Sequence, residues 1–241
     1  MQIISPKPVT ANALTCRVPD IDVTDLLSFL VRTPASAYKA AKALGFSLST
    51  AYAKATRARQ HGFLETQGHD LYITVRGLIY CLCKSCEERR LVLERIMQRY
   101  EIKTEPAYVE AYIYMLLKAL DILSIPLTHA PVERLCSSAT LLLTVLNRTS
   151  IKDLYKSLRV DKEIFSAAMP VLAEGLARLG LAVDLGTHYY FPSLGVVVCK
   201  RPCNKESCNL SDETTKLKRK IKISLHENPE RHRKRGILTY S

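Results

Sequence analysis

The sequence lacks a long apolar run, and this absence excludes one broad class of protein. The longest uncharged, apolar-rich stretch lies at 135–147, shorter than the about 18 residues that a membrane-spanning helix needs. The first residues, MQIISPKPVT, do not combine a charged start with an apolar core, so they are not typical of a secretory signal. We therefore expect a cytoplasmic protein with no membrane-spanning helix and no membrane partner.

Sequence signatures of enzymes are also absent. The chain contains no GxxxxGK[ST] phosphate loop, no GxGxxG turn and no HExxH zinc helix, and these are spacings that hold nucleotides or a catalytic metal. No serine or cysteine has a local catalytic signature. We expect no enzymatic activity and no small-molecule substrate.

Acidic residues are missing from one stretch near the N-terminus. Residues 35–64 contain no Asp or Glu, although the 241-residue chain has 23 of them. A helix that lies among phosphates needs this absence, because a carboxylate would repel the polyanion. The alternative is a solvated basic helix face. The same stretch contains the cations Lys39, Lys42, Lys54, Arg57 and Arg59.

Positive charge is concentrated near the C-terminus. The net charge of the chain is +12, and residues 216–235 contain nine Lys/Arg against Glu227 and Glu230. A basic tail favours a polyanionic partner such as nucleic acid, with salt-sensitive contacts. A solvated tail that aids solubility is the alternative. We predict non-specific DNA contacts from Lys218, Arg219 and Lys220.

The same pattern of residues occurs twice along the chain. LLSFLVRT at 26–33 matches LLTVLNRT at 142–149, at an offset of 116. Further on the offset grows to 118, which fits short insertions at turns or helix ends. A unit of about 55 residues suits a small domain present twice. The residues that recur at an offset of 118 are Gly62, Gly68, Tyr72, Gly77 and Cys81, as Gly180, Gly186, Tyr190, Gly195 and Cys199.

The repeat predicts two domains, a first copy at 21–83 and a second copy at 135–200, joined by a helical connector at 84–134. Residues 1–20 form an N-terminal extension, and 201–241 form a basic tail that contains cysteine. In the first copy, apolar spacing and capping residues predict helices at 22–32, 36–44 and 47–61, followed by a hairpin around Gly68. The predicted fold class is α+β, mainly α with small β-hairpin wings.

The stretch SLSTAYAKATRARQHGFLETQGHDLYITVRG at 47–77 resembles the winged helix-turn-helix superfamily of DNA-binding domains. The resemblance lies in the third helix, which begins with serine, the glycine that ends this helix, the two-stranded ribbon that follows, and the sequence pattern Tyr72–Gly77 at the end of the ribbon. It covers about 21–81 and, more weakly, 138–199. It implies that the third helix enters the major groove and that the ribbon, or wing, contacts the backbone or the minor groove.

The third helix of the first copy has side chains that suit DNA. If Ala51, Ala55 and Ala58 face the core, the opposite face carries small polar groups and an arginine, which fit base edges and phosphates. The predicted contacts are Lys39 and Lys42 before this helix, Ser49, Ala53, Thr56, Arg57 and Gln60 on its face, Thr50 and Lys54 beside that face, and His69 in the wing.

The second copy has different chemistry at the equivalent helix. That helix is expected at about 166–179, with Pro170 in its first turn. Its expected exposed face is poor in groups for phosphates, so we predict that this copy packs against a partner or its twin. Lys152, Lys156 and Arg159 remain candidates for backbone contact. The expected exposed residues are Ala167, Pro170, Glu174 and Ala177.

Two further helices are predicted between the copies. Residues 87–101 are amphipathic, whereas 108–125 are apolar on almost all sides. A helix without a polar face is buried, so the second of these is either a spine between the copies or a dimer interface. We favour a homodimer.

Three cysteines follow each hairpin, and they suggest a metal centre. Thiolates that converge on one point can hold zinc or an iron–sulfur cluster, and each needs about four ligands. Neither triplet supplies four alone, so His226, His232 or the other triplet would complete the site. Buried thiols and disulfides are the alternatives, and Cys16 and Cys136 stand alone. The candidate ligands are Cys81, Cys83, Cys86, Cys199, Cys203 and Cys208.

Three functions are compatible with these observations. The first is a sequence-specific, double-stranded-DNA-binding regulator of transcription, which uses the third helix of the first copy. The second is a plasmid or viral replication or partition protein. The third is an adaptor subunit of transcription machinery with a metal cluster, but the absence of acids from residues 35–64 of the first copy disfavours a pure adaptor.

Overall fold

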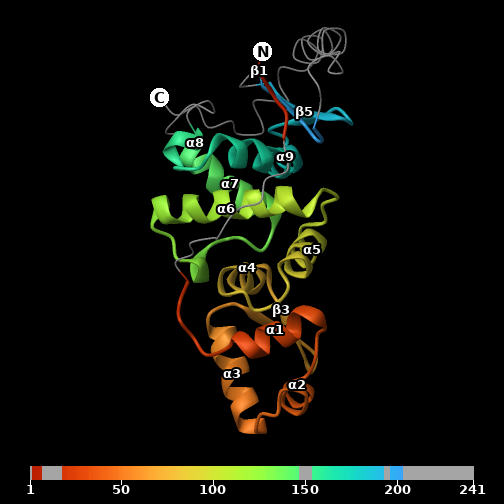
Figure 1. Ribbon diagram of the computed structural model, residues 1–241, viewed down its shortest axis with the longest axis vertical. Coiled ribbons are helices and arrows are strands. Elements are labelled where there is room, and N and C mark those ends of the chain that lie inside the picture. Colours follow the sequence, from red (N-terminus) through yellow and green to blue (C-terminus); the bar gives the residue numbers. More distant parts are fainter. Residues whose placement is uncertain (1, 7–17, 147–153, 193–195, 203–241) are drawn as a thin grey trace, which may run out of the picture. The chain divides into compact units, whose positions relative to one another are not determined.

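The computed structural model describes residues 2–6, 18–146, 154–192 and 196–202 (Figure 1). Helices make up most of this part of the chain, and the strands form two small sheets. The mainly helical α+β class predicted from the sequence is confirmed. The predicted basic contacts Lys152, Lys218, Arg219 and Lys220, the ligand candidates Cys203 and Cys208, and Cys16 lie outside the described residues.

The first copy folds as three helices and a hairpin, as predicted. These elements are α1 (Thr24–Arg32), α2 (Ala37–Leu44), α3 (Leu48–Gln60), β2 (Leu64–Gln67) and β3 (Asp70–Ile73). Ser36 caps α2 by accepting from the Lys39 N–H at 3.3 Å, and Ser47 caps α3 by accepting from the Thr50 N–H at 3.1 Å. Gly45 follows α2 with φ of +69°, a left-handed conformation that glycine adopts without steric cost.

Two helices follow the hairpin and support it. Helix α4 (Val75–Lys84) starts directly after β3, and α5 (Arg89–Tyr100) lies close to the predicted 87–101. The sequence did not predict α4. Its side chains are buried almost throughout, between α1 and α5.

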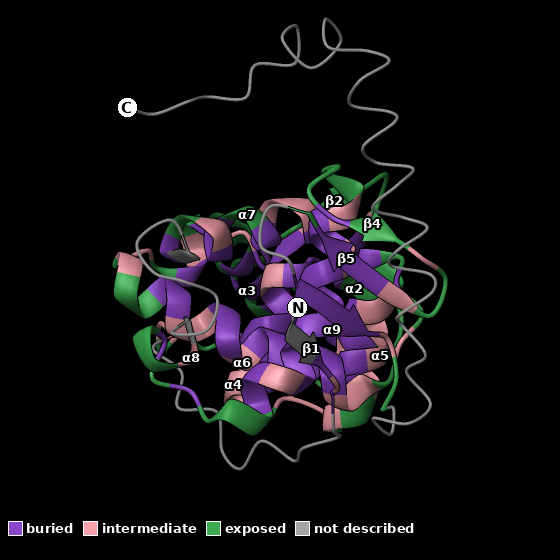
Figure 2. Cartoon of the chain, turned by 90° about the horizontal axis from the view of Figure 1, so that it is seen from above, coloured by how far each residue is buried: buried purple, intermediate pink, exposed green. Residues whose placement is uncertain are grey.

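Helix α6 (Pro106–Leu123) is the buried spine of the described chain. It packs against α5, α7 (Leu135–Leu146) and α9 (Lys162–Arg178), and Figure 2 shows α6 and α9 as mostly buried. Of the two alternatives for 108–125, the structure therefore shows the spine. The apolar surface of α6 is covered within one chain, although Ile122 near its end is 45% exposed.

The second copy contains α7, the short helix α8 (Leu154–Ser157), α9 and a sheet. The strands are β4 (Val183–Asp184), β5 (His188–Phe191) and β6 (Val196–Cys199), which pair antiparallel. Strand β1 (Gln2–Ile4) joins this sheet in parallel with β6, in a register that pairs Ile3 with Val197. The sequence assigned β1 to an N-terminal extension, because three residues carry too little periodicity to predict a distant strand pair.

A short 3-10 helix, η1 (Leu127–His129), lies between α6 and α7. The described residues belong to one compact unit. Within the described residues, no helix has the length and apolar character to span a bilayer.

Candidate nucleic-acid interface

Helix α3 places its small apolar side chains inward and its polar side chains outward. Ala51, Ala55 and Ala58 are at most 4% exposed, as the sequence predicted. On the other sides the helix is open to solvent. All predicted contacts on this helix except Lys54 are exposed, namely Ser49, Thr50, Ala53, Thr56, Arg57 and Gln60.

Lys54 differs from the prediction. Its side chain is 9% exposed and forms an ion pair with Asp22, and its Nζ also donates to the Asp22 carbonyl at 3.3 Å. The ammonium lies 5.2 Å from the Phe46 ring centroid, within reach of a cation–π contact. The hydrogen bond from Lys54 lowers the pKa of Asp22 below its ordinary value. Lys54 therefore holds α3 against the segment before α1 and is not an exposed cation.

The remaining cations of the acid-free stretch are exposed. Lys39 and Lys42 on α2 and Arg57 and Arg59 on α3 all reach solvent. The Arg57 guanidinium makes no hydrogen bond or ion pair with any described residue. These four side chains place positive charge on two neighbouring helices that pack together.

Three large apolar side chains near these cations are also exposed, and the sequence analysis missed them. Tyr38 on α2 is 63% exposed, and Leu48 and Tyr52 on α3 are 45% and 56% exposed. A signal was present in the sequence, because all three lie outside the alanine stripes that α2 and α3 bury.

The hairpin carries little positive charge. His69 is exposed next to Gly68, whose φ of +63° makes the tight turn. Glu65 in β2 is 3.2 Å from the Arg99 Nη1 of α5, so its charge is compensated. Of the predicted DNA contacts, His69 is the one that lies on the hairpin, and its side chain is exposed.

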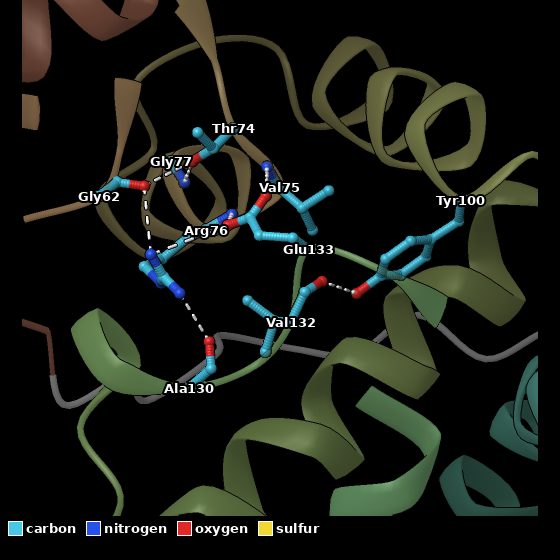
Figure 3. A network of polar contacts seen from close by, with 9 residues as sticks. All are labelled: Gly62, Thr74, Val75, Arg76, Gly77, Tyr100, Ala130, Val132 and Glu133. Atoms are coloured by element: carbon cyan, nitrogen blue, oxygen red, sulfur yellow. Dashed lines mark hydrogen bonds and ion pairs between the residues drawn. The ribbon is translucent and has the colours of Figure 1, made fainter. Parts of the chain in front are cut away.

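A cap at the start of α4 fixes the end of α3. The Thr74 hydroxyl donates to the Gly62 carbonyl at 2.8 Å and accepts from the Gly77 N–H at 3.0 Å (Figure 3). A Cβ on Gly77 would lie 2.4 Å from the Phe63 carbonyl oxygen, so only glycine fits there. The recurring glycines Gly62 and Gly77 therefore mark where α4 lies against residues 62–63, which follow α3.

The segment after η1 holds the same corner from the other side. Glu133 accepts from the N–H groups of Val75 at 3.0 Å and Arg76 at 3.3 Å, so its carboxylate lies at the positive end of α4 (Figure 3). Arg76 Nη2 donates to the Ala130 carbonyl at 2.8 Å. These contacts connect the start of α4, and through Thr74 the segment after α3, to the segment between η1 and α7.

A bidentate ion pair ties α1 to the turn before α5. The Arg32 guanidinium donates to both Glu87 oxygens, at 2.7 and 3.1 Å. The hydrogen bonds from Arg32 and the Glu88 N–H lower the pKa of Glu87 from 4.5 to about 2. Arg95 of α5 donates to the Arg32 carbonyl at 2.7 Å, at the C-terminal end of α1.

Helix α9 occupies the place of α3 in the second copy, and it is buried. The structure corrects two predictions here. First, α9 begins at Lys162, so Pro170 lies inside it and not in its first turn. Second, the predicted exposed face is covered, because α6 and α7 pack on α9 together with β4, β5 and β6. Ala167 and Pro170 are buried, and Glu174 and Ala177 are partly buried.

Position by position, the two helices share the inner stripe and differ outside it. Met169, Ala173 and Leu176 repeat the buried stripe of α3. Outside the stripe, Gly175 of α9 matches Arg57, and Arg178 matches Gln60. Arg178 donates to the Tyr100 and Glu101 carbonyls at 2.8 Å each, at the end of α5. The surface that is open on α3 is therefore an internal interface on α9.

The cysteine triplets lie in different settings. Cys81 and Cys83 belong to α4, whereas Cys199 ends β6. Cys81 is buried, and burial raises the pKa of its thiol. Cys83 takes part in a disulfide, and Cys86 is partly buried. Across 2–6, 18–146, 154–192 and 196–202, no three His, Cys, Asp or Glu side chains are grouped as a metal site.

Comparisons with known proteins do not place the chain in a family. No protein-family model matches the chain, and no curated protein or solved structure is significantly similar to it.

Proposed function

We propose that this chain is a sequence-specific DNA-binding protein, a regulator of transcription, with α1–α3 and the β2–β3 hairpin as a winged helix-turn-helix. Helix α3 is the helix that enters the major groove. The observation that carries the proposal is that the outer face of α3 is open, basic and free of acids, whereas Ala167, Pro170 and Gly175 on the matching face of α9 are buried. A repeat that keeps one helix exposed preserves that surface for an external partner.

The exposed side chains match the chemistry of duplex DNA. The major groove admits one α-helix, and an arginine that reaches the floor binds guanine O6 and N7 with two hydrogen bonds. Arg57 is exposed and makes no hydrogen bond or ion pair with a described residue, although its charge helps to lower the pKa of Asp22, so it can make this contact without breaking a hydrogen bond. Lys39 and Lys42 on α2 are placed for phosphates, which position the protein without reading sequence.

One chain supplies one reading helix under this proposal. Because α9 is covered by α6 and α7, the internal duplication does not supply a second half-site. A palindromic target therefore requires two chains, with the half-sites about one helical turn apart. For this reason we include a homodimer in the proposal.

Selection from random-sequence duplex by the full chain, at two salt concentrations, tests the proposal. We expect a recovered motif whose binding is weakened by Arg57→Ala and unchanged by Arg90→Ala. Arg90 is a suitable control, because it is an exposed arginine on α5 that pairs with its helical neighbour Glu94 at 3.0 Å. Binding without a motif and steep in salt would make the protein a non-specific binder. No duplex binding at moderate salt would favour the adaptor function.

A further inference from the structure

Helix α3 presents two chemically different flanks on either side of a line of small side chains. At about 100° per residue, Ser49, Ala53, Thr56 and Gln60 lie opposite the buried alanines. Arg57 and Thr50 fall on one side of this line, and Leu48 and Tyr52 fall on the other. All of these residues are exposed, so the helix offers a cationic, polar flank and an apolar, aromatic flank.

The apolar flank has no covering group in the described chain. Leu48 and Tyr52 are 45% and 56% exposed, although α3 is otherwise a polar helix outside its alanine stripe. In the second copy the residues that match Leu48 and Tyr52 contact other parts of the chain. Ser166 donates to the Ser5 carbonyl at 2.8 Å, and Pro170 is buried. Only in the first copy are these two positions open.

The charge around this flank selects the class of partner. Arg59 follows the same side of α3 as Leu48 and Tyr52, and Lys39 and Lys42 are exposed on the neighbouring helix α2, with no acid between 35 and 64. A polyanion therefore approaches this face favourably, and an acid-free surface is what a helix among phosphates requires. The occupant we commit to is duplex DNA.

Duplex DNA presents one apolar group in the major groove, the 5-methyl of thymine. In helix-turn-helix proteins, residues at the N-terminal end of the reading helix contact base edges. Leu48 is the first residue of α3 and Tyr52 the fifth, so both lie in the part of the helix that reaches deepest. Ala53 lies between the two flanks on the line of small residues, where it leaves room for a base edge.

We infer that Leu48 and Tyr52 read thymine methyl groups in the target, while Arg57 reads a guanine on the opposite flank of α3. This inference rests on the proposed function and adds the base preference of the same surface. Each half-site then contains thymine toward the N-terminal end of α3 and a G·C pair toward its C-terminal end, where Arg57 lies in the last turn.

Replacing thymine by deoxyuridine in the selected duplex tests the inference, because it removes the methyl and leaves every hydrogen-bonding group in place. Each thymine of the motif is replaced singly, and the full chain is titrated against each duplex. We expect at least one replacement to weaken wild-type binding by about fourfold, the effect of one buried methyl. The same replacement should have little effect on Tyr52→Ala or on Leu48→Ser.

The controls separate this inference from the proposed function. Tyr38→Ala removes an exposed tyrosine on α2, and it should keep the wild-type response to deoxyuridine. If the duplex is selected but no thymine replacement matters, the methyl-reading role is wrong and the proposed function stands. An equal response in wild type, Leu48→Ser and Tyr52→Ala also overturns the role. If selection recovers no motif, the proposed function fails and the inference falls with it.

Discussion

Arg57 and Gly175 occupy the same position of the two copies, 118 residues apart, and have opposite surroundings. Arg57 is exposed, whereas a Cβ on Gly175 would lie 2.9 Å from the Ala139 Cβ and 3.2 Å from Leu135 Cγ. At this position α9 packs against α7, and α3 packs against nothing that the structure describes. The same helix of the repeat therefore serves as core in one copy and as surface in the other.

Placing leucine at these two positions separates the two roles. Gly175→Leu should lower the free energy of unfolding by about 1–3 kcal/mol or more, because a packed core has no room for the side chain. Arg57→Leu should change it by less than about 0.5 kcal/mol and should abolish selective DNA binding. Urea unfolding and gel shifts on both variants give the comparison. Equal stability losses would mean that α3 is covered as α9 is.

Thr74 joins the end of α3 to the start of α4. Thr74→Ala should cost about 1–2 kcal/mol of stability, because α4 loses its N-cap and the Gly62 carbonyl loses a donor. Thr74→Ser keeps the hydroxyl and should recover most of this loss. Urea unfolding of the two variants is the measurement, and an alanine variant as stable as the serine variant would contradict the capping role.

The Arg32–Glu87 pair predicts a pH dependence of stability. The folded-state pKa of Glu87 is about 2, below its ordinary 4.5, so its contribution is complete above pH 4.5 and is lost as the pH falls toward 2. Wild type should therefore be more stable than Glu87→Gln at pH 6, and the difference should shrink below pH 4.5. Urea unfolding at a series of pH values measures it. A difference that is constant from pH 6 to pH 3 would contradict the lowered pKa.

Lys54 and Lys42 are predicted to have different roles, although both lie in the acid-free stretch. Lys54→Met removes the ion pair with Asp22, so it should lower Tm by a few degrees and leave base selectivity intact. Lys42→Met should leave Tm unchanged and weaken binding to all duplexes alike, because an exposed lysine contacts phosphate. Thermal unfolding and duplex titration of each variant check this. If Lys54→Met lost base selectivity without losing stability, Lys54 would be a DNA contact and not a structural residue.

Local signals predicted the first copy well. Ser36, Gly45 and Ser47 mark helix ends through contacts with near neighbours in sequence, and Gly68 marks a hairpin turn by its own backbone preference. Such features act over a few residues, so a single sequence contains them. The alanine stripe of α3 was correct for the same reason, because helical spacing sets it.

Long-range packing was not predictable in this way. Lys54 was assigned to solvent, because its partner Asp22 is 32 residues away. The sequence predicts that the outer face of α9 packs against a partner or its twin, because nothing local states that α6 and α7 of the same chain cover it. Strand β1 and the cap that Glu133 gives to α4 likewise depend on residues far apart in sequence. In each case the contacting residue or element lies far away in the sequence.

The most direct test is the affinity of the full chain for the selected duplex and for a scrambled one, measured by fluorescence anisotropy for wild type, Arg57→Ala and Arg90→Ala. We predict that Arg57→Ala lowers affinity for the selected duplex by roughly five- to 150-fold, the effect of about 1–3 kcal/mol for one arginine–guanine contact. Arg90→Ala should bind as wild type does, and binding to the scrambled duplex should change little in either variant. Equal affinities for wild type and Arg57→Ala on the selected duplex would contradict the assignment of α3 as the reading helix.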